Sequence, residues 1–152
     1  MMRVLALDVG ERRIGVALSD PSGTVARPLC TVERGSRAED FAAIAELVAE
    51  QEVELVVVGW PLTLRGESGP QAQRVEEYAR ALDEALPVPL RMWDERYSTL
   101  SAEEIMRRFR EGGRRRSRGG PGVDAVAAAV ILQAFLDSQV MDRGKGNGEG
   151  RG

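Results

Sequence analysis

The hydrophobic pattern of this chain changes near residue 36, and the change restricts the folds that the chain can adopt. Before it, short apolar runs separated by turn residues are typical of an antiparallel meander; they cover residues 3–9, 14–20 and 24–32. After it, helical spacing alternates with β-branched runs at residues 53–59 and 88–95. The order predicts three antiparallel strands followed by βαβ units.

Four segments carry apolar residues at helical spacing, and they lie at 36–48, 75–86, 101–109 and 125–136. Right-handed crossovers place the fourth and fifth strands beyond the first, which gives the strand order 3-2-1-4-5. The first strand is then central, consistent with its continuous apolar run. We therefore expect an α/β fold with a mixed five-stranded sheet and helices on both faces.

The length of 152 residues fits one domain. We place that domain at residues 1–140 and expect residues 141–152, a glycine-rich tail of low complexity, to be disordered. The sequence has no apolar run of 18 residues and no apolar signal region at its start. We therefore expect a cytoplasmic protein with no membrane partner.

Three features of the composition restrict the chemistry. The chain contains no histidine and only one cysteine, Cys30, which excludes histidine-based triads, imidazole ligands and thiolate zinc sites. Of the 21 basic residues, Lys145 is the only lysine, so the positive charge is almost entirely guanidinium, which suits phosphate. Carboxylates, hydroxyls and arginines remain as the reactive groups.

The net charge of −3 hides a cluster of opposite sign. Seven arginines and one acid lie between Arg107 and Arg118, so this stretch carries +6 and the rest of the chain −9. Such a run can be merely a solvated loop. The alternative is a nucleic-acid contact, and for it we expect phosphate binding by Arg114, Arg115, Arg116 and Arg118.

Acidic residues occur at three positions that a fold alone would not select. Asp8 ends the central strand, where burial disfavours a carboxylate, although a turn-forming Asp is the ordinary alternative. Asp94 and Glu95 follow the fifth strand, where they could also be a solvated pair. Asp124 opens the last helix, where an acid also stabilises the helix dipole by about 0.3–1 kcal/mol.

These acids could converge on one point. Strands 1 and 5 flank strand 4 and so lie about 10 Å apart, at ~4.8 Å for each strand step. Without histidine or a usable thiol, a carboxylate cluster commonly holds hard cations. Two Mg²⁺ ions can activate water and stabilise a leaving oxygen in phosphodiester cleavage. The arginine run would meet the polyanionic substrate.

Four segments together resemble the YqgF family of the ribonuclease H-like superfamily: LALDVGERRIGVALSD (5–20), VVVGWPLTLRGESG (56–69), DERYST (94–99) and VDAVAAAVILQAFLD (123–137). Members are described as candidate Holliday-junction resolvases and as nucleases that process the 5′ end of pre-16S ribosomal RNA. The resemblance covers residues 3–137 with all motifs in order. It implies a ribonuclease H-like nuclease domain.

The resemblance also implies roles for single residues. The three acids of the family match Asp8, Glu95 and Asp124, which would be catalytic and would hold the metal, with Asp94 as a possible fourth ligand. Asp8 would bridge two Mg²⁺ or Mn²⁺ ions. Arg13 and Arg96 match motif positions and are expected to bind phosphates. The remaining motif positions match Gly10, Gly15, Gly59, Pro61 and Thr99.

We therefore expect a metal-dependent nuclease that acts on structured nucleic acid, with pre-16S rRNA favoured over a four-way DNA junction. A resolvase cuts two strands symmetrically and should be a dimer, whereas the sequence has no evident dimer face and predicts a monomer or weak homodimer. A non-catalytic RNA-binding module is a further alternative. A two-lobed ATPase, which also carries an Asp-x-Gly turn, needs a longer chain.

Overall fold

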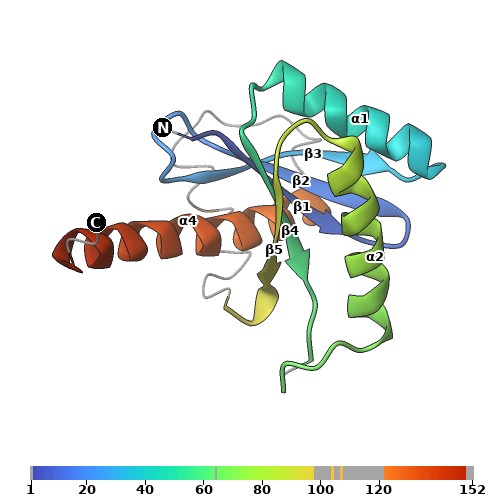
Figure 1. The fold of residues 1–152 in the computed structure, drawn as a ribbon. Helices are drawn as coiled ribbons and strands as arrows, with labels where there is room; N and C mark the ends of the chain where they lie inside the picture. Colours follow the sequence, from blue (N-terminus) through green and yellow to red (C-terminus); the bar gives the residue numbers. More distant parts are fainter. Residues whose placement is uncertain (1, 64, 98–103, 105–106, 108–121, 150–152) are drawn as a thin grey trace.

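The structure is a computed structural model that describes residues 2–63, 65–97, 104, 107 and 122–149. Five strands form one sheet in the order β3-β2-β1-β4-β5, as predicted (Figure 1). The strands are β1 (Val4–Val9), β2 (Arg13–Ser19), β3 (Ala26–Glu33), β4 (Leu55–Trp60) and β5 (Leu90–Asp94). The β1–β2 and β2–β3 pairs are antiparallel, whereas β4 is parallel to both β1 and β5.

Helices cover both faces of this sheet. The helices α1 (Arg37–Glu50) and α2 (Pro70–Ala85) pack on one face, and α4 (Val123–Glu149) crosses the other face (Figure 1). A single 3₁₀ turn, η1 (Glu95–Tyr97), follows β5. The helix predicted at residues 101–109 lies almost entirely outside the described residues.

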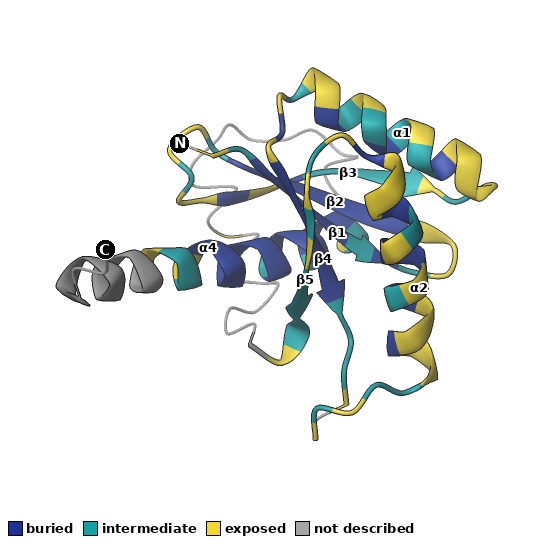
Figure 2. Cartoon of the chain, viewed as in Figure 1, coloured by how far each residue is buried: buried dark blue, intermediate teal, exposed yellow. Residues whose placement is uncertain are grey.

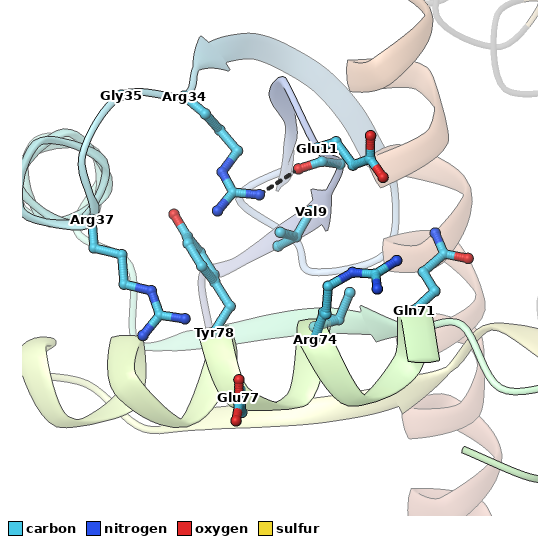
Figure 3. A pocket seen from close by; sticks show the side chains of 11 residues that line it. Val9, Glu11, Arg34, Gly35, Arg37, Gln71, Arg74, Glu77 and Tyr78 are labelled. Atoms are coloured by element: carbon cyan, nitrogen blue, oxygen red, sulfur yellow. Dashed lines mark hydrogen bonds between the residues drawn. The ribbon is translucent and has the colours of Figure 1, made fainter. Parts of the chain in front are cut away.

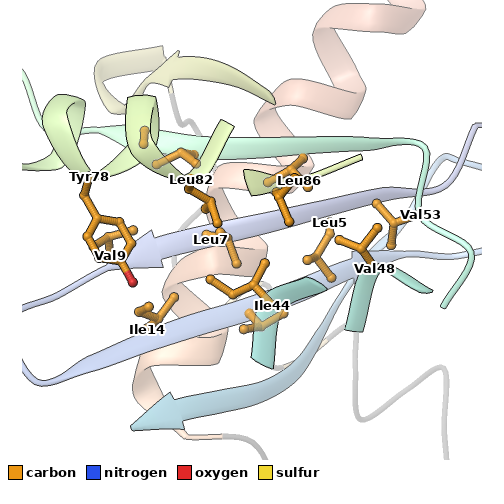
Figure 4. Packing of buried hydrophobic residues seen from close by; sticks show 14 of the residues in the cluster. Leu5, Leu7, Val9, Ile14, Ile44, Val48, Val53, Tyr78, Leu82 and Leu86 are labelled. Atoms are coloured by element: carbon orange, nitrogen blue, oxygen red, sulfur yellow. The ribbon is translucent and has the colours of Figure 1, made fainter. Parts of the chain in front are cut away.

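The alternation of side chains along β1 divides the core into two clusters. Leu5, Leu7 and Val9 point toward α1 and α2, where they contact Ile44 and Leu82 (Figure 4). Val4 and Ala6 point toward α4 and join its apolar residues. Figure 2 shows β1 buried along nearly its whole length. Asp8 follows Ala6 in this alternation, so its side chain belongs to the α4 face.

The edge strand β3 accommodates the proline that its sequence contains. Val16 pairs with Cys30 and Ala17 pairs with Pro28, so Leu29 is an extra residue in the β3 ladder. Proline cannot donate a ladder hydrogen bond and is tolerated at an edge or a bulge. Pro28 lies on the edge strand and directly beside the bulge at Leu29.

Among the side chains of α4 that the structure describes, which end at Val140, the buried polar one is Gln133. Its Oε1 accepts a hydrogen bond from the Ala26 amide at 2.9 Å, and its Nε2 donates to the Thr24 carbonyl at 2.9 Å. The segment Val123–Val140 is long and apolar enough to cross a membrane by length and composition, and 56% of it is buried inside the fold. A core helix of a soluble protein passes the same test.

Two details differ from the expected pattern. The buried face of α1 consists of Asp40, Ile44 and Val48, so it includes an acid that the apolar spacing did not identify. The helix α4 continues to Glu149, beyond the predicted domain boundary at residue 140. Each glycine lowers helix stability by about 1 kcal/mol relative to alanine, and several glycines occur after residue 143. The disorder expected for residues 141–152 therefore stays a prediction.

Candidate active site

Asp8 lies at the centre of the candidate site, near the carboxyl end of β1. The strands β2 and β4 flank β1, so the backbone of Asp8 is enclosed on both sides. Burial, and secondarily the nearby Asp124 carboxylate, raise the pKa of Asp8 above its usual value. A carboxyl group that is costly to ionise in isolation is favoured as an anion when a cation binds beside it.

A glycine on β2 brings Asp124 to this position. Gly15 pairs directly with Asp8 across the β1–β2 ladder. A Cβ atom built on Gly15 would lie 1.8 Å from the Asp124 carbonyl oxygen, which is impossible for any side chain. The first turn of α4 therefore packs against the sheet only because residue 15 has no side chain.

A second glycine, on β4, brings Glu95 to the other side. Leu7 pairs with Val58, so Gly59 is the next residue of β4 beside Asp8. A Cβ atom on Gly59 would lie 2.6 Å from Glu95 Oε2 and 2.5 Å from Ile131 Cδ1. Burial, then the carboxylates of Asp8 and Asp94, raise the pKa of Glu95 to about 7. Glu95 thus reaches across β4 toward Asp8.

The three carboxylates are a suitable donor set for a divalent cation. Hard oxygen ligands suit Mg²⁺ and Mn²⁺, and mutual repulsion among the acids favours a cation between them. Within the described part of the chain, no three acids lie close enough to enclose one ion as they stand. Asp124 Oδ2 instead accepts a hydrogen bond from Arg13 Nε at 2.9 Å, and both side chains are partly exposed.

Asp94, which the sequence left open as a fourth ligand, is bound by an arginine two residues away. Its Oδ1 accepts hydrogen bonds from the backbone and Nε of Arg96, each at 3.0 Å, and its Oδ2 accepts from Nη2. The Arg96 side chain, followed by its backbone amide, holds the pKa of Asp94 below its usual value. Gly66, at φ +84°, packs beside the same guanidinium. This contact orients Arg96 at the end of β5.

Two further motif residues shape the backbone around the site. The Gly10 amide donates to the Arg13 carbonyl at 2.9 Å in the β1–β2 turn, where a Cβ would lie 2.8 Å from that oxygen. Pro61 follows β4, and the Leu62 amide donates to the Trp60 carbonyl across it. Thr99, Arg114, Arg115, Arg116 and Arg118 lie outside the described residues.

The structure also reveals a polar cluster on the opposite face of the sheet. Asp40 is 1% exposed and accepts hydrogen bonds from Tyr78 Oη and the Gly35 amide, each at 2.8 Å. Arg34 Nε lies 3.5 Å from Asp40 Oδ2. Sequence reasoning missed this cluster, although Asp40 occurs four residues before Ile44 and eight before Val48, on the buried face of α1.

Comparison with solved structures identifies the class of fold. A chain of Thermus thermophilus RuvC in complex with a Holliday junction substrate has a TM-score of 0.58 and 20% identity, over 91% of this chain and 96% of that one. Fowlpox virus resolvase in complex with Holliday junction DNA has a TM-score of 0.52 and 7% identity, over 91% and 99%. The chain has the ribonuclease H-like fold that the sequence predicts.

Sequence comparison identifies the family. The family model RuvX, described as Holliday junction resolvase, matches residues 2–138. The chain therefore belongs to this family of nucleases, which is also called YqgF. Relatives named "Putative pre-16S rRNA nuclease" include one from Caldanaerobacter subterraneus subsp. tengcongensis, 47% identical over 91% of this chain and 98% of the relative. Another, from Chloroflexus aurantiacus, is 46% identical over 90% and 87%.

Proposed function

We propose that this chain is a divalent-metal-dependent nuclease of the cytoplasm that processes the 5′ end of pre-16S rRNA. One observation carries the proposal: Gly15 and Gly59, on either side of Asp8, leave the space in which Asp124 and Glu95 approach it. Three acids from separate elements thereby lie near one another at the carboxyl end of β1, close enough for their charges to raise the pKa values of Asp8 and Glu95. The names of the relatives support the choice of RNA.

In this proposal, Asp8, Glu95 and Asp124 hold one or two Mg²⁺ or Mn²⁺ ions. When bound, such ions polarise the phosphoryl group and lower the pKa of water. Glu95, with its pKa near 7, can keep a proton on its carboxyl group at neutral pH until a cation displaces it. To hold the cation, Asp124 would have to give up its hydrogen bond with Arg13.

The arginines near the site position the substrate. Arg13 is exposed beside Asp124, and its guanidinium is free to contact a phosphate once Asp124 turns to the cation. Arg96 is held in a fixed orientation by Asp94 at the end of β5. Guanidinium forks suit phosphate oxygens in bidentate geometry. Arg114, Arg115, Arg116 and Arg118 would add contacts farther along the strand.

A second candidate substrate is a four-way DNA junction. It is favoured by the description of the family model and by the fold shared with RuvC, whose solved complex contains a Holliday junction. The same three acids would carry out the cleavage. The two candidates differ in the number of active sites required, because a junction is resolved by paired cuts.

The experiment compares labelled pre-16S rRNA fragments and a four-way junction, each with and without Mn²⁺, using the purified protein and its Asp8→Asn variant. We expect Mn²⁺-dependent cleavage near the mature 5′ end of the RNA, and a loss of at least about 100-fold in the variant, since it removes the central charge of the site. Asp83→Asn, on the exposed surface of α2, is the matched control. Equal cleavage by Asp8→Asn would reject the proposed site.

A further inference from the structure

A cavity of about 570 Å³ lies on the α1–α2 side of the sheet, and the proposed cleavage chemistry does not use it. It is bounded by the β1–β2 turn, by the segment between β3 and α1, and by the first half of α2 (Figure 3). Three arginines line it: Arg34, Arg37 and Arg74. Arg34 and Arg37 lie three residues apart, just before and at the start of α1, and the fold brings Arg74 of α2 to them.

One of these arginines is rigidly held. Arg34 Nη1 donates to the Gly10 carbonyl at 2.7 Å, and its guanidinium lies 4.5 Å from the centroid of the Tyr78 ring. Tyr78 is itself fixed by its hydrogen bond to the buried Asp40. Asp40 balances the charge of Arg34, so this part of the cavity is a neutral, preorganised wall.

The other two arginines are held less tightly than Arg34. Arg37 lies over the Tyr78 ring at 5.5 Å, and neither Arg37 nor Arg74 takes part in an ion pair among the described residues. Glu11 and Glu77 also line the cavity. In Figure 3, Glu77 projects from α2 on the side away from Arg34. Two guanidinium groups that form no ion pair within the described part of the chain give this side of the cavity a chemistry suited to a phosphate.

The cavity is adjacent to the candidate active site. It is lined by Val9, the last residue of β1, and by Gly10, and these two residues directly follow Asp8. Successive residues of a strand point to opposite faces, so Asp8 faces α4 while Val9 faces the cavity. A nucleic-acid strand that passes over the carboxyl end of β1 can therefore contact both sites.

We propose that this cavity binds a backbone phosphate of the substrate strand, outside the point of cleavage, through Arg37 and Arg74. The inference rests on the proposed nuclease function and adds to it a second anchoring point. The same chemistry would also accept a free nucleotide. The geometry favours a nucleic-acid strand over a free nucleotide, because the cavity and Asp8 both lie at the carboxyl end of β1.

The test measures RNA binding in the Asp8→Asn background, so that cleavage does not interfere. We compare the salt dependence of affinity for a single-stranded RNA among three proteins: the Asp8→Asn parent, the same protein with Arg37→Ala and Arg74→Ala, and a control with Arg27→Ala and Arg80→Ala. The control removes two exposed arginines outside the cavity. Each lost phosphate contact flattens the log–log slope by about 0.7 on a single strand.

We expect the slope of the cavity variant to flatten by about 1.4, for two lost contacts, while the control retains the parent slope. Equal slopes in the cavity variant and the control would overturn the inference. Binding of adenosine monophosphate that depends on Arg37 and Arg74, with the RNA slope unchanged, would also overturn it and assign the cavity to free nucleotides. Because the assay measures binding alone, its result is independent of whether the wild-type protein cleaves RNA.

Discussion

Two glycines determine where the carboxylates of the candidate site can lie. Gly15 and Gly59 occupy the strands on either side of Asp8, and at each one a side chain would enter space that Asp124 or Glu95 fills. The described glycines with a positive φ are Gly23 and Gly66, so neither Gly15 nor Gly59 needs the left-handed conformation. Close packing, rather than backbone conformation, therefore accounts for glycine at these positions.

Replacing Gly15 with alanine tests this explanation. The added Cβ would overlap the Asp124 carbonyl, so the first turn of α4 must move away from β2. We expect a loss of about 1–3 kcal/mol in the free energy of unfolding, measured by urea denaturation, together with a loss of nuclease activity. Gly69→Ala is the control, because a Cβ there meets only Thr63 Cγ2 at 3.9 Å. Unchanged stability and activity in Gly15→Ala would contradict the packing explanation.

Glu95 makes the stability of the metal-free protein depend on pH. Its pKa rises from 4.5 in the unfolded chain to about 7 in the fold, so the folded state binds a proton more tightly between these values. The free energy of unfolding should therefore fall as the pH rises from about 4.5 to about 7, and then level off. The raised pKa of Asp8 acts in the same direction.

The variant Glu95→Gln removes this titration. We expect it to be more stable than the wild type above pH 7 and to lose less stability between pH 4.5 and 7, as measured by thermal denaturation with a chelator present. Glu77→Gln, an exposed glutamate of α2, should follow the wild-type profile. A profile of Glu95→Gln that matches the wild type would show that the folded protein does not disfavour the Glu95 anion.

At the scale of elements, α4 is fixed to the sheet edge by a polar contact within an apolar interface. Gln133 is 2% exposed and joins α4 to the backbone of residues 24 and 26. We expect Gln133→Leu to lower the free energy of unfolding by about 1–3 kcal/mol, because the buried Ala26 amide loses its partner. Gln139→Leu, on the same helix, should have a smaller effect in the same urea denaturation. Equal effects would show that the buried contact contributes nothing specific.

The elements themselves were largely predictable from the sequence, for identifiable reasons. The continuous apolar run of β1 fixes a central strand, and the β-branched run of β4 fixes its parallel neighbour. The partners of individual side chains were harder to predict from the sequence, because they depend on how separate elements approach one another. Thus Asp8 and Glu95 were identified from their place at strand ends, whereas the pairing of Asp124 with Arg13 was not.

At the scale of the whole molecule, the two faces of the sheet carry groups of opposite charge near the carboxyl end of β1. The candidate carboxylates lie on the α4 side, and the arginine-lined cavity lies on the α1–α2 side. Both sides are reached at the carboxyl ends of the parallel strands, where open α/β sheets bind ligands. If both proposals hold, one strand of nucleic acid would contact both sites of a single molecule.

This arrangement leads us to expect a monomer, or a weak dimer, that cuts RNA in preference to a junction. A single active site suffices for one cut, whereas a resolvase needs two sites facing the junction. Sedimentation with and without a four-way junction measures this directly. A tight complex of two proteins and one junction, with paired symmetric nicks, would reverse our choice of substrate but leave the carboxylate site intact.

The most direct test of the central claim is anomalous diffraction from crystals soaked in Mn²⁺. We predict Mn²⁺ density in contact with Asp8, Glu95 and Asp124, with Asp124 turned away from Arg13, and no such density in crystals of Asp8→Asn. Wild-type crystals that hold Mn²⁺ elsewhere but none at these three carboxylates would contradict the claim that they form a metal-dependent active site.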